Sequence, residues 1–471
     1  TGIGGDCFCL YSPLGSTQLI AFNGSGQTPA AASLEWYQSH GINTIERQSP
    51  HSVTVPGAIN AWCQLNEDYG KLPLAALLER AVHYARDGYP VTSRVSVDFA
   101  TQVELLQNNP AAGAVFLADG ITPGAGSLHR QPALAATLEA IGQSGREAFY
   151  QGEIAADMVD ALQALGGLHT LEDFATVSGE YVTPIKTRYK DYDVFQVPPN
   201  GQGVIALQLL NIVSEFAVDE PLSPERLHLE IEAGRQAYQD RALYVADQQH
   251  AQVPVEWLLS AQHAAEIRQS INPAQRLADI PSYTSPGHRS TVYISVVDKD
   301  RNACSFINSL FHSFGSVQMA PKSGVMFHNR GESFVLTPGH PNCIAPRKRP
   351  MHTIIPGMVA ANDQVIMPYG VMGGDYQSYG HMQFLTRHLD FGMDIQEAQD
   401  APRLFPTPGV NEVEYESTFS HSTIEALKKL GHPMVPASRP IGGSQAISIN
   451  WQTGILTGGS DPRKDGCAIG Y

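Results

Sequence analysis

The segment HRSTVYISVVDKDRNACSFINSLF, residues 288–311, lies a little past the middle of the chain. It predicts two β-strands, because apolar and β-branched residues fill both halves and the polar sequence DKDRN separates them. A polar loop, SYTSPGHRS (residues 282–290), precedes the first strand. Thr291 therefore stands at the head of a regular strand, directly after this loop. That placement makes Thr291 the first candidate for a functional residue.

The composition is typical of a soluble globular protein. The chain has 471 residues, enough for one large or two medium domains whose core needs no disulfide or metal. Hydrophobic residues make up 42% and charged residues 16%. The 30 basic and 46 acidic residues give a formal net charge of −16, which argues against nucleic acid or an anionic membrane as a partner. No run of about 18 apolar residues occurs, so no transmembrane helix is predicted.

The six cysteines are scattered and predict neither a disulfide framework nor a zinc site. No pair has the CxxC spacing, so we expect thiols in a reducing compartment and no bound metal. This expectation favours a cytoplasmic location. The chain begins with Thr1 instead of methionine and shows no signal peptide, so we expect that an upstream segment has been removed.

The spacing of apolar residues changes from a helical to a strand pattern at the loop before Thr291. Between residues 55 and 165, and again from 223 to 247, apolar residues recur at helical spacings between glycines and prolines. The second stretch begins with Ser223 and a proline, a typical helix start, and we interpret this helix as scaffold. After Thr291, segments such as TVYISVVD, ACSFINSLF and SGVMFHN predict strands. Strands are also predicted at the start of the chain, so we expect an α+β fold whose early and late strands share sheets.

Thr291 could act as a nucleophile if the chain were cleaved directly before it. A threonine hydroxyl becomes a strong nucleophile when a base takes its proton, and the α-amino group of an N-terminal threonine can be that base. Cleavage of the Ser290–Thr291 peptide bond would create this amine. Threonine is also a common strand residue, so a structural role is the alternative.

A pair of glycines offers the second part of such a site. The sequence MPYGVMGGDYQ places Gly373 and Gly374 between a predicted strand and a predicted helix. Two consecutive N–H groups without side chains can form an oxyanion hole, and glycine lets a carbonyl approach closely. The alternative is a turn that needs glycine only for its backbone conformation.

Ordered motifs along nearly the whole chain resemble those of one family. They are GIGGD, VPGAINAW, YGKLPLAALLERAVHYARDGYPV, REAFYQGEIA, VPPNGQGVIALQLLNI, STVYISVVDKDRNACSF, APRKRPMHTIIP, GVMGGD, EAQDAPR and GGSDPRKDGCAIGY. The chain resembles the gamma-glutamyltranspeptidases, N-terminal-nucleophile hydrolases that cut themselves to free a catalytic threonine. The resemblance implies a four-layer αββα sandwich. It also implies a helix-rich large subunit of residues 1–290 and a strand-rich small subunit of residues 291–471, both from one precursor.

The resemblance assigns catalytic roles to particular residues. Thr291 corresponds to the nucleophile, and Ser290 to the residue before the cut. Ser309 corresponds to a hydroxyl that hydrogen-bonds the nucleophile. Gly373 and Gly374 correspond to the oxyanion glycines. No metal or organic cofactor is implied.

The family residues that hold a glutamyl substrate are replaced in this chain. An arginine in an RET motif, which binds the α-carboxylate, corresponds to Asn23 in FNGSG. The acidic residue that binds the α-amino group corresponds to Ser333. A serine pair that also binds the carboxylate corresponds to His352 and Thr353.

Two further replacements change the expected charge of the substrate pocket. A neighbouring position on the amino-group side is Arg330, and a family asparagine corresponds to Phe311. Arg330 would repel an α-ammonium group and bind a carboxylate with a two-pronged pair of hydrogen bonds. The alternative for Arg330 is a surface arginine paired with Glu332.

We therefore expect a self-processing amidohydrolase that acts on a small anionic amide. Our first choice is oxamate, cleaved to oxalate and ammonia, because these replacements resemble the oxamate amidohydrolase branch of bacterial purine catabolism. The alternatives are a gamma-glutamyl hydrolase or transferase, a glutaryl acylase of the cephalosporin type, and an uncleaved binding scaffold without activity. The expected partners are the substrate and the two subunits, and a homo-oligomer is compatible with the sequence.

Overall fold

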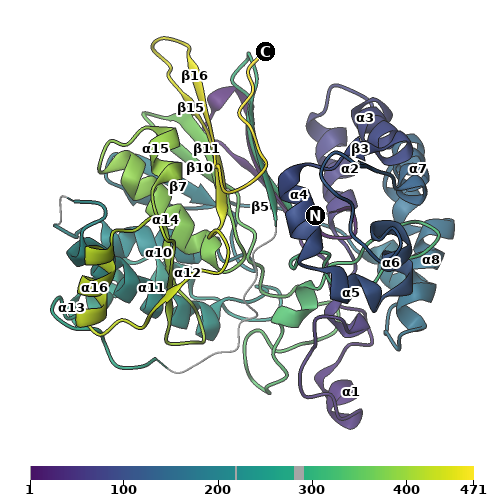
Figure 1. Cartoon of the computed structure of the whole chain (residues 1–471), viewed down its shortest axis with the longest axis horizontal. Coiled ribbons are helices and arrows are strands. Elements are labelled where there is room, and N and C mark those ends of the chain that lie inside the picture. Colours follow the sequence, from purple (N-terminus) through teal and green to yellow (C-terminus); the bar gives the residue numbers. More distant parts are fainter. Residues whose placement is uncertain (1, 218–219, 281–290) are drawn as a thin grey trace. The chain divides into compact units, whose positions relative to one another are not determined.

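The chain divides into two compact units in the computed structural model (Figure 1). The structure describes residues 2–217, 220–280 and 291–471. The first unit contains residues 1–7, 23–180 and 308–350, and the second contains residues 8–22, 181–307 and 351–471. Each unit takes segments from both sides of Thr291, so neither unit coincides with a predicted subunit.

A six-stranded sheet forms the centre of the second unit, and all its neighbouring strands are antiparallel. Its order is β16 (Leu456–Ser460), β15 (Gly443–Ile449), β11 (Gln364–Met372), β10 (Gly357–Ala361), β7 (Tyr192–Gln196) and β6 (Ile185–Tyr189). The two strands at one edge come from before Thr291 and the other four from after it.

A five-stranded sheet contains the two strands that follow Thr291. Its order is β5 (Glu180–Val182), β2 (Ile20–Gly24), β1 (Asp6–Ser12), β9 (Ala303–Ser309) and β8 (Val292–Val297). The predicted strand pair after Thr291 is thus formed by β8 and β9, which are neighbours in the sheet. Both sheets combine strands from before Thr291 with strands from after it, as the sequence predicted.

Within the second unit, the two faces of the six-stranded sheet contact different layers. Met358 and Ala360 on β10 join an apolar core with Phe8 and Tyr293 of the other sheet. Val359 points to the opposite face, because side chains alternate along a strand, and it joins a second core formed with helices. The second unit is therefore built from a helical layer and two stacked sheets.

Three helices provide most of the helical layer: α10 (Gly203–Val213), α11 (Pro224–Tyr244) and α14 (Tyr376–Leu389) (Figure 1). Helix α10 is buried on nearly all sides because its sequence, GVIALQLLNIV, is almost entirely apolar. Helix α11 begins where the sequence predicted, since Ser223 Oγ accepts a hydrogen bond from the Arg226 N–H at 3.2 Å.

The first unit is mainly helical. Its larger helices are α2 (Ala58–Tyr69), α3 (Leu74–Asp87), α7 (Pro132–Tyr150) and α8 (Gly152–Gln163). Leu78, Leu138, Ile141 and Phe149 form part of its core. Helices α3 and α7 pack side by side (Figure 1).

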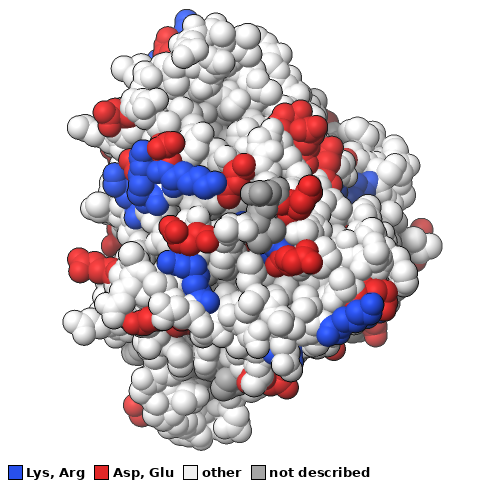
Figure 2. Space-filling model, turned by 90° about the vertical axis from the view of Figure 1, so that its left-hand side faces the viewer, with Lys and Arg blue, Asp and Glu red and all other residues white. Residues whose placement is uncertain are grey.

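Shorter elements complete the described residues. They are α1 (Leu34–Ser39), α4 (Ser93–Ala100), α5 (Val103–Gln107), α6 (Pro110–Phe116), α9 (Leu171–Thr176), α12 (Val255–Leu258), α13 (Ala261–Ser270), α15 (Ile395–Asp400), α16 (His421–Lys429), β3 (Tyr89–Pro90), β4 (Leu128–His129), β12 (Leu404–Pro406), β13 (Val413–Tyr415) and β14 (Met434–Pro436). No helix among the described residues is long and apolar enough to span a bilayer. Acidic and basic side chains are interspersed over the face drawn in Figure 2.

The strand predicted at SGVMFHN, residues 323–329, was wrong. This segment of the first unit makes only isolated bridges, at Met326 and Phe327. The segment itself explains the difference, because Gly324 within it has a φ value of 69°. Such left-handed backbone interrupts an extended strand.

Candidate active site

Thr291 lies at the predicted position, directly before β8, and only 8% of its surface is exposed. The strands behind it are linked by a hydrogen bond of 2.8 Å between the Tyr293 hydroxyl and Ser305 Oγ. A nearly buried residue at the start of a packed strand has little freedom to move, and nucleophilic catalysis needs such a defined position. Ser290, the predicted residue before the cut, lies outside the described residues.

Gly373 and Gly374 form the turn between β11 and α14, as the sequence predicted. Their φ values are 135° and 61°, in the region that favours glycine. A Cβ atom on Gly373 would also lie only 2.9 Å from the Cα of Gly442. The turn therefore requires glycine for its own conformation, whether or not it also binds an oxyanion.

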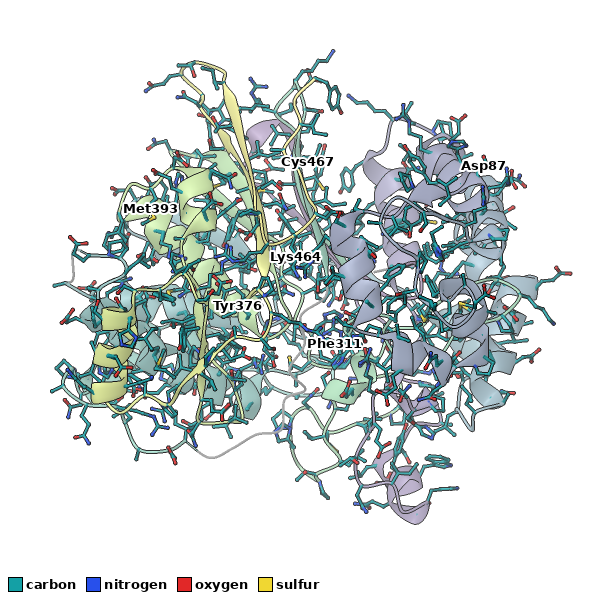
Figure 3. The ribbon with its side chains drawn as sticks, viewed as in Figure 1. Asp87, Phe311, Tyr376, Met393, Lys464 and Cys467 are labelled. Carbon is teal, nitrogen blue, oxygen red and sulfur yellow. The ribbon has the colours of Figure 1, made fainter. Side chains whose placement is uncertain are left out.

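A hydrogen bond of this turn fixes the direction of the Gly374 N–H group. The Gly373 carbonyl accepts the N–H of Tyr376 at 3.2 Å, so it points into α14, which Tyr376 opens (Figure 3). In a trans peptide the N–H points opposite to the carbonyl. The Gly374 N–H consequently points away from the helix, a direction that suits a donor to a bound oxyanion.

The strand after Thr291 packs directly on the strand that leads to this turn. Strand β8 contacts β11, and a Cβ atom on Gly370 would lie 2.3 Å from the ring of Tyr293. Thr291 is two residues before Tyr293, and Gly373 is three residues after Gly370. Both lie within about 10 Å of chain from this contact.

A buried polar network that the sequence analysis did not find lies behind the glycine turn. Gln202 Nε2 donates to the Gly374 carbonyl at 3.0 Å and to the Thr353 carbonyl at 2.8 Å. Arg241 on α11 donates to Gln202 Oε1 at 2.7 Å and to Asp375 Oδ1 at 2.6 Å. The motifs VPPNGQG and GVMGGD contained three of these residues, Gln202, Gly374 and Asp375, but nothing local indicated that they meet.

His352 and Thr353 are brought next to the glycine turn by the same glutamine. Their side chains are fully or almost fully buried, and the His352 ring packs on Phe8 with a centroid distance of 4.9 Å. The His352 backbone pairs with the segment around Gln202: its N–H donates to Asn200 and its carbonyl accepts from Gln202, both at 2.8 Å. The structure therefore collects Thr353 and the two glycines around one side chain of the second unit.

Arg330 belongs to the first unit, and the alternative of a surface arginine is wrong because the residue is fully buried. Its guanidinium carbon lies 3.9 Å from the ring centroid of Phe311, which is labelled in Figure 3. This stacking fixes the plane of the guanidinium group. Two residues that replace the glutamyl-binding groups of the family are thus in direct contact.

The remaining predicted residues of the first unit form local hydrogen bonds. Ser309 Oγ, at the end of β9, accepts the Phe311 N–H at 2.9 Å, and Ser333 Oγ donates to the Arg330 carbonyl at 2.9 Å. Asn23 lies in β2, and its Oδ1 accepts the Ser25 N–H at 3.0 Å. Ser309 and Ser333 therefore support the backbone of the Phe311–Arg330 pair.

The surroundings of Arg330 carry a positive potential. Burial, together with the charges of Arg47 and Arg330, lowers the pKa of His312 to about 3. Burial raises the pKa of Glu332 to about 7, although Asn329 and the two arginines act in the opposite direction. Near neutral pH the two cations are therefore only partly compensated by Glu332.

One group of residues has the composition of a metal site: His228, Glu232 and His432, all buried in the second unit. Their polar atoms are largely satisfied by other bonds. His228 Nδ1 lies 2.7 Å from His432 Nε2, a hydrogen-bond distance that leaves no room for an ion between them. Glu232 accepts from Arg235 at 2.9 Å and from the Leu277 N–H at 3.0 Å. We therefore interpret the cluster as a structural hydrogen-bond network.

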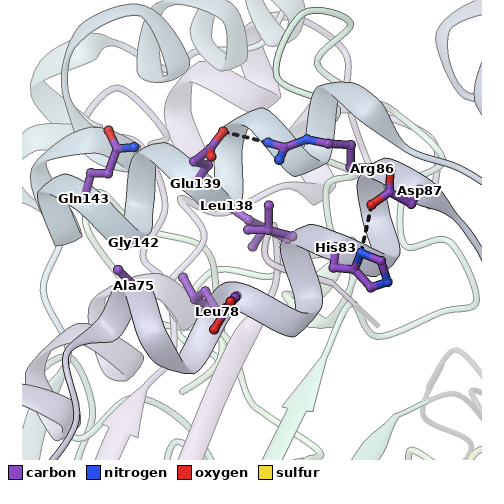
Figure 4. A pocket seen from close by; sticks show the side chains of 11 residues that line it. Ala75, Leu78, His83, Arg86, Asp87, Leu138, Glu139, Gly142 and Gln143 are labelled. Carbon is purple, nitrogen blue, oxygen red and sulfur yellow. Dashed lines mark hydrogen bonds and ion pairs between the residues drawn. The ribbon is translucent and has the colours of Figure 1, made fainter.

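A surface pocket of about 330 Å³ lies between α3 and α7 of the first unit (Figure 4). Two side-chain pairs line it: Arg86 donates to Glu139 at 2.7 Å, and His83 Nδ1 lies 2.8 Å from Asp87 Oδ2. None of the predicted site residues lines this pocket.

Comparison with known proteins identifies the class and the family. The whole chain, residues 1–471, matches the family model described as Gamma-glutamyltranspeptidase. Among solved structures, the cephalosporin acylase from Bacillus halodurans has a TM-score of 0.92 and 38% identity, covering 100% of this chain and 88% of that chain. The protein is therefore an N-terminal-nucleophile hydrolase that acts on amide bonds. It belongs to the gamma-glutamyltranspeptidase family.

The names of two similar proteins include the word proenzyme. The chain is 35% identical over 478 residues to the glutathione hydrolase-like YwrD proenzyme of Bacillus subtilis, covering 100% of this chain and 90% of the relative. It is 33% identical over 483 residues to the oxamate amidohydrolase proenzyme of Klebsiella pneumoniae, again covering 100% and 90%. The predicted family, α+β fold class and enzyme class are confirmed.

Proposed function

We propose that this protein cleaves its own Ser290–Thr291 bond and then hydrolyses amides with Thr291 as the nucleophile. The observation that carries the proposal is the packing of Tyr293 on Gly370. Through this contact, the strand that follows Thr291 lies against the strand that leads to Gly373 and Gly374. The proenzyme names of its relatives support a cleavage step.

The proposed reaction uses the chain's own groups. The α-amine of Thr291 accepts the hydroxyl proton, and Oγ1 attacks the amide carbonyl. The N–H groups of Gly373 and Gly374 bind the oxyanion of the tetrahedral intermediate. The ammonium group then protonates the departing nitrogen, which leaves an ester on Thr291, and a water molecule activated by the same amine hydrolyses the ester. The resemblance gives Ser309 a hydrogen bond to the nucleophile, and that role stays a prediction.

The cleavage step is tested by intact mass under denaturing conditions, comparing the purified protein with Thr291→Ala. We expect two fragments that end and begin at the 290/291 bond in the native protein, and one uncut chain in the variant. Thr291→Ser is the matched variant that keeps a hydroxyl, and it should cleave slowly. A native chain that stays uncut would contradict the proposal and favour the binding-scaffold alternative.

For the substrate, we propose a small amide that carries a carboxylate and no α-ammonium group. Arg330 and Arg47 create a positive potential that Glu332 compensates only partly near neutral pH. A carboxylate is attracted to such a site, and an ammonium group is repelled. Oxamate is the first choice because one relative is named oxamate amidohydrolase, and a glutaryl amide is the second because a solved relative is named cephalosporin acylase.

A panel of three amides separates these substrates. Oxamate is measured by ammonia release, and gamma-glutamyl-p-nitroanilide and glutaryl-p-nitroanilide are measured by colour. The last two differ only in the α-amino group, so their ratio of kcat/KM reports how strongly the site rejects that group. We expect glutaryl over gamma-glutamyl by about tenfold or more, the effect of one unfavourable charge pair. A preference for the gamma-glutamyl amide would instead support the glutathione hydrolase alternative.

A further inference from the structure

The side chain of Gln202 links two loops that lie at the proposed reaction centre. It lies between β7 and α10 and is fully buried. Its amide nitrogen donates to the carbonyls of both Gly374 and Thr353, and its own backbone carbonyl accepts from Ser378 Oγ at 3.0 Å. The amide nitrogen and the backbone carbonyl of this residue therefore bind the glycine turn and the helix that follows it.

Arg241 holds this glutamine in place. Its Nη1 atom donates to both Gln202 and Asp375, and only 4% of the arginine is exposed. Tyr238, one turn earlier on α11, donates through its hydroxyl to the carbonyl of Asp375. The residue that follows the glycine pair is thus fixed through its side chain and its backbone by α11.

We propose that Gln202 and Arg241 are positioning residues that set the orientation of the Gly374 peptide for oxyanion binding. This inference rests on the proposed function, because it gives a catalytic purpose to the turn that they hold. Gln202 fixes the carbonyl side of Gly374, while the hydrogen bond to Tyr376 fixes the preceding peptide. With the peptides on both sides of the Gly374 Cα held, the Gly374 N–H keeps one direction in the absence of substrate.

The size of the expected effect follows from the demands of an oxyanion hole. Loss of one donor typically lowers kcat by about 10²–10³-fold, and a misplacement of about 1 Å can have a similar effect. Gln202 does not itself donate to the oxyanion, so we expect a smaller loss, roughly 10–10²-fold. The affinity for substrate should change little, because an oxyanion exists only after the nucleophile has attacked.

Gln202→Met and Gln208→Met form a matched pair of variants. Gln208 is also fully buried, and its amide nitrogen donates to Asp240 Oδ2 at 2.5 Å, so it links α10 to α11 without touching the glycine turn. Both substitutions remove a buried amide, and both should lower the Tm by similar amounts. Cleavage at residue 290 is followed by intact mass, and kcat and KM are then measured per cleaved molecule with the best amide of the panel.

We expect Gln202→Met to lower kcat by roughly 10–10²-fold with KM within about threefold, and Gln208→Met to change kcat by less than about twofold. Equal values of kcat for the two variants would overturn the inference while leaving the proposed function intact. Failure of the proposed function looks different, since the unmodified protein would then stay uncut or hydrolyse no amide.

Substitutions of Arg241 form a second, independent set of variants. They test the same inference if Gln202→Met does not fold. Both hydrogen bonds come from a single nitrogen, so Arg241→Lys can keep part of the arrangement and Arg241→Met cannot. We expect kcat to fall in the order native, lysine, methionine, at nearly constant KM. A lysine variant as slow as the methionine variant, with an equal Tm, would count against a positioning role.

Discussion

The ring of Tyr293 lies so close to Gly370 that no side chain fits between them. A Cβ atom on Gly370 would approach three ring carbons of Tyr293 at 2.3, 2.4 and 2.7 Å. Since Tyr293 is two residues from Thr291 and Gly370 is three residues from Gly373, this contact sets the distance between the proposed nucleophile and the proposed oxyanion hole. The glycine is therefore required by packing, in a regular strand where its backbone freedom has no use.

Replacement of Gly370 by alanine should separate β8 from β11 and slow both cleavage and hydrolysis. The added methyl group overpacks the core between the sheets, at a cost of about 1–3 kcal/mol in stability. We expect the rate of cleavage at residue 290 to fall by about tenfold or more, because the reacting groups move apart.

Gly357→Ala is the control for this prediction. It adds the same methyl group in the same sheet, where a Cβ atom would lie 2.5 Å from the ring of Tyr369 instead. Both variants should show a lower Tm, but only Gly370→Ala should process slowly in a time course of intact mass. Equal cleavage rates would show that the Tyr293 contact does not set the geometry of the reaction.

Arg330 should determine the kcat/KM of the enzyme for an anionic amide. In Arg330→Met we expect kcat/KM for the preferred anionic amide to fall by roughly 10²-fold, because a charged hydrogen bond contributes about 1.5–3 kcal/mol. Arg330→Lys should recover only part of the activity, since lysine cannot reproduce a flat group stacked on Phe311. A neutral amide of similar size is the control, and its kcat/KM should change by less than about threefold in both variants. A uniform loss for charged and neutral amides would instead indicate a structural role.

Local patterns predicted the parts of the site that depend on one stretch of chain. The strand start at Thr291 and the glycine turn at Gly373 were both visible, because a strand boundary and a backbone requirement leave a local signature. The partnership of Arg241 with Asp375 was not visible, since the two residues are 134 positions apart and the helix that carries Arg241 looked like scaffold. Only the tertiary packing of α11 and α14, which both contact α10, brings them together.

The same limit explains why the sequence left a surface position open as the alternative for Arg330, and why it wrongly predicted a strand at SGVMFHN. An arginine beside a glutamate in a polar sequence reads as a surface pair, and nothing local showed that the segment is buried. The apolar residues in SGVMFHN predicted a strand, but the left-handed conformation of Gly324 breaks the extended path inside the segment. Burial and backbone conformation both depend on distant parts of the first unit.

The stability of the protein should depend on pH through Glu332. Burial raises the pKa of Glu332 to about 7 in the folded protein, whereas the ordinary value is 4.5. Between these values the unfolded chain loses a proton that the folded chain keeps, so stability falls as the pH rises from about 5 to 7 and is constant above. We expect Glu332→Gln to raise the Tm at pH 8 relative to the native protein, by the equivalent of about 1–3 kcal/mol.

Measurements at pH 5 are the internal control for Glu332→Gln. The native carboxyl group is protonated there, so both proteins carry a neutral side chain and their Tm values should nearly agree. The variant must also keep the contact with Asn329, which donates to Glu332 Oε2. A Tm difference that is the same at pH 5 and pH 8 would show that burial does not raise the pKa of the Glu332 carboxyl group.

Cys9 and Cys304 should form a disulfide when the protein is oxidised. They lie on the neighbouring strands β1 and β9, and their sulfur atoms are 3.7 Å apart. A disulfide needs about 2.05 Å between the sulfurs, so a small rotation of the side chains is sufficient. With oxidised glutathione, the Cys304 thiolate displaces one glutathione, and the Cys9 thiolate then displaces the second, so that one protein disulfide and two reduced glutathiones result.

The expected product is one peptide pair, cross-linked through Cys9 and Cys304, that a reductant separates again. Cys304→Ser should abolish this pair, whereas Cys63→Ser should leave it unchanged, because Cys63 lies on α2 in the first unit. Peptide mapping after alkylation of the remaining thiols gives the result directly. If both thiols stay open to alkylation after oxidation, the two strands hold them in directions that cannot be bridged, and the short sulfur distance reflects packing alone.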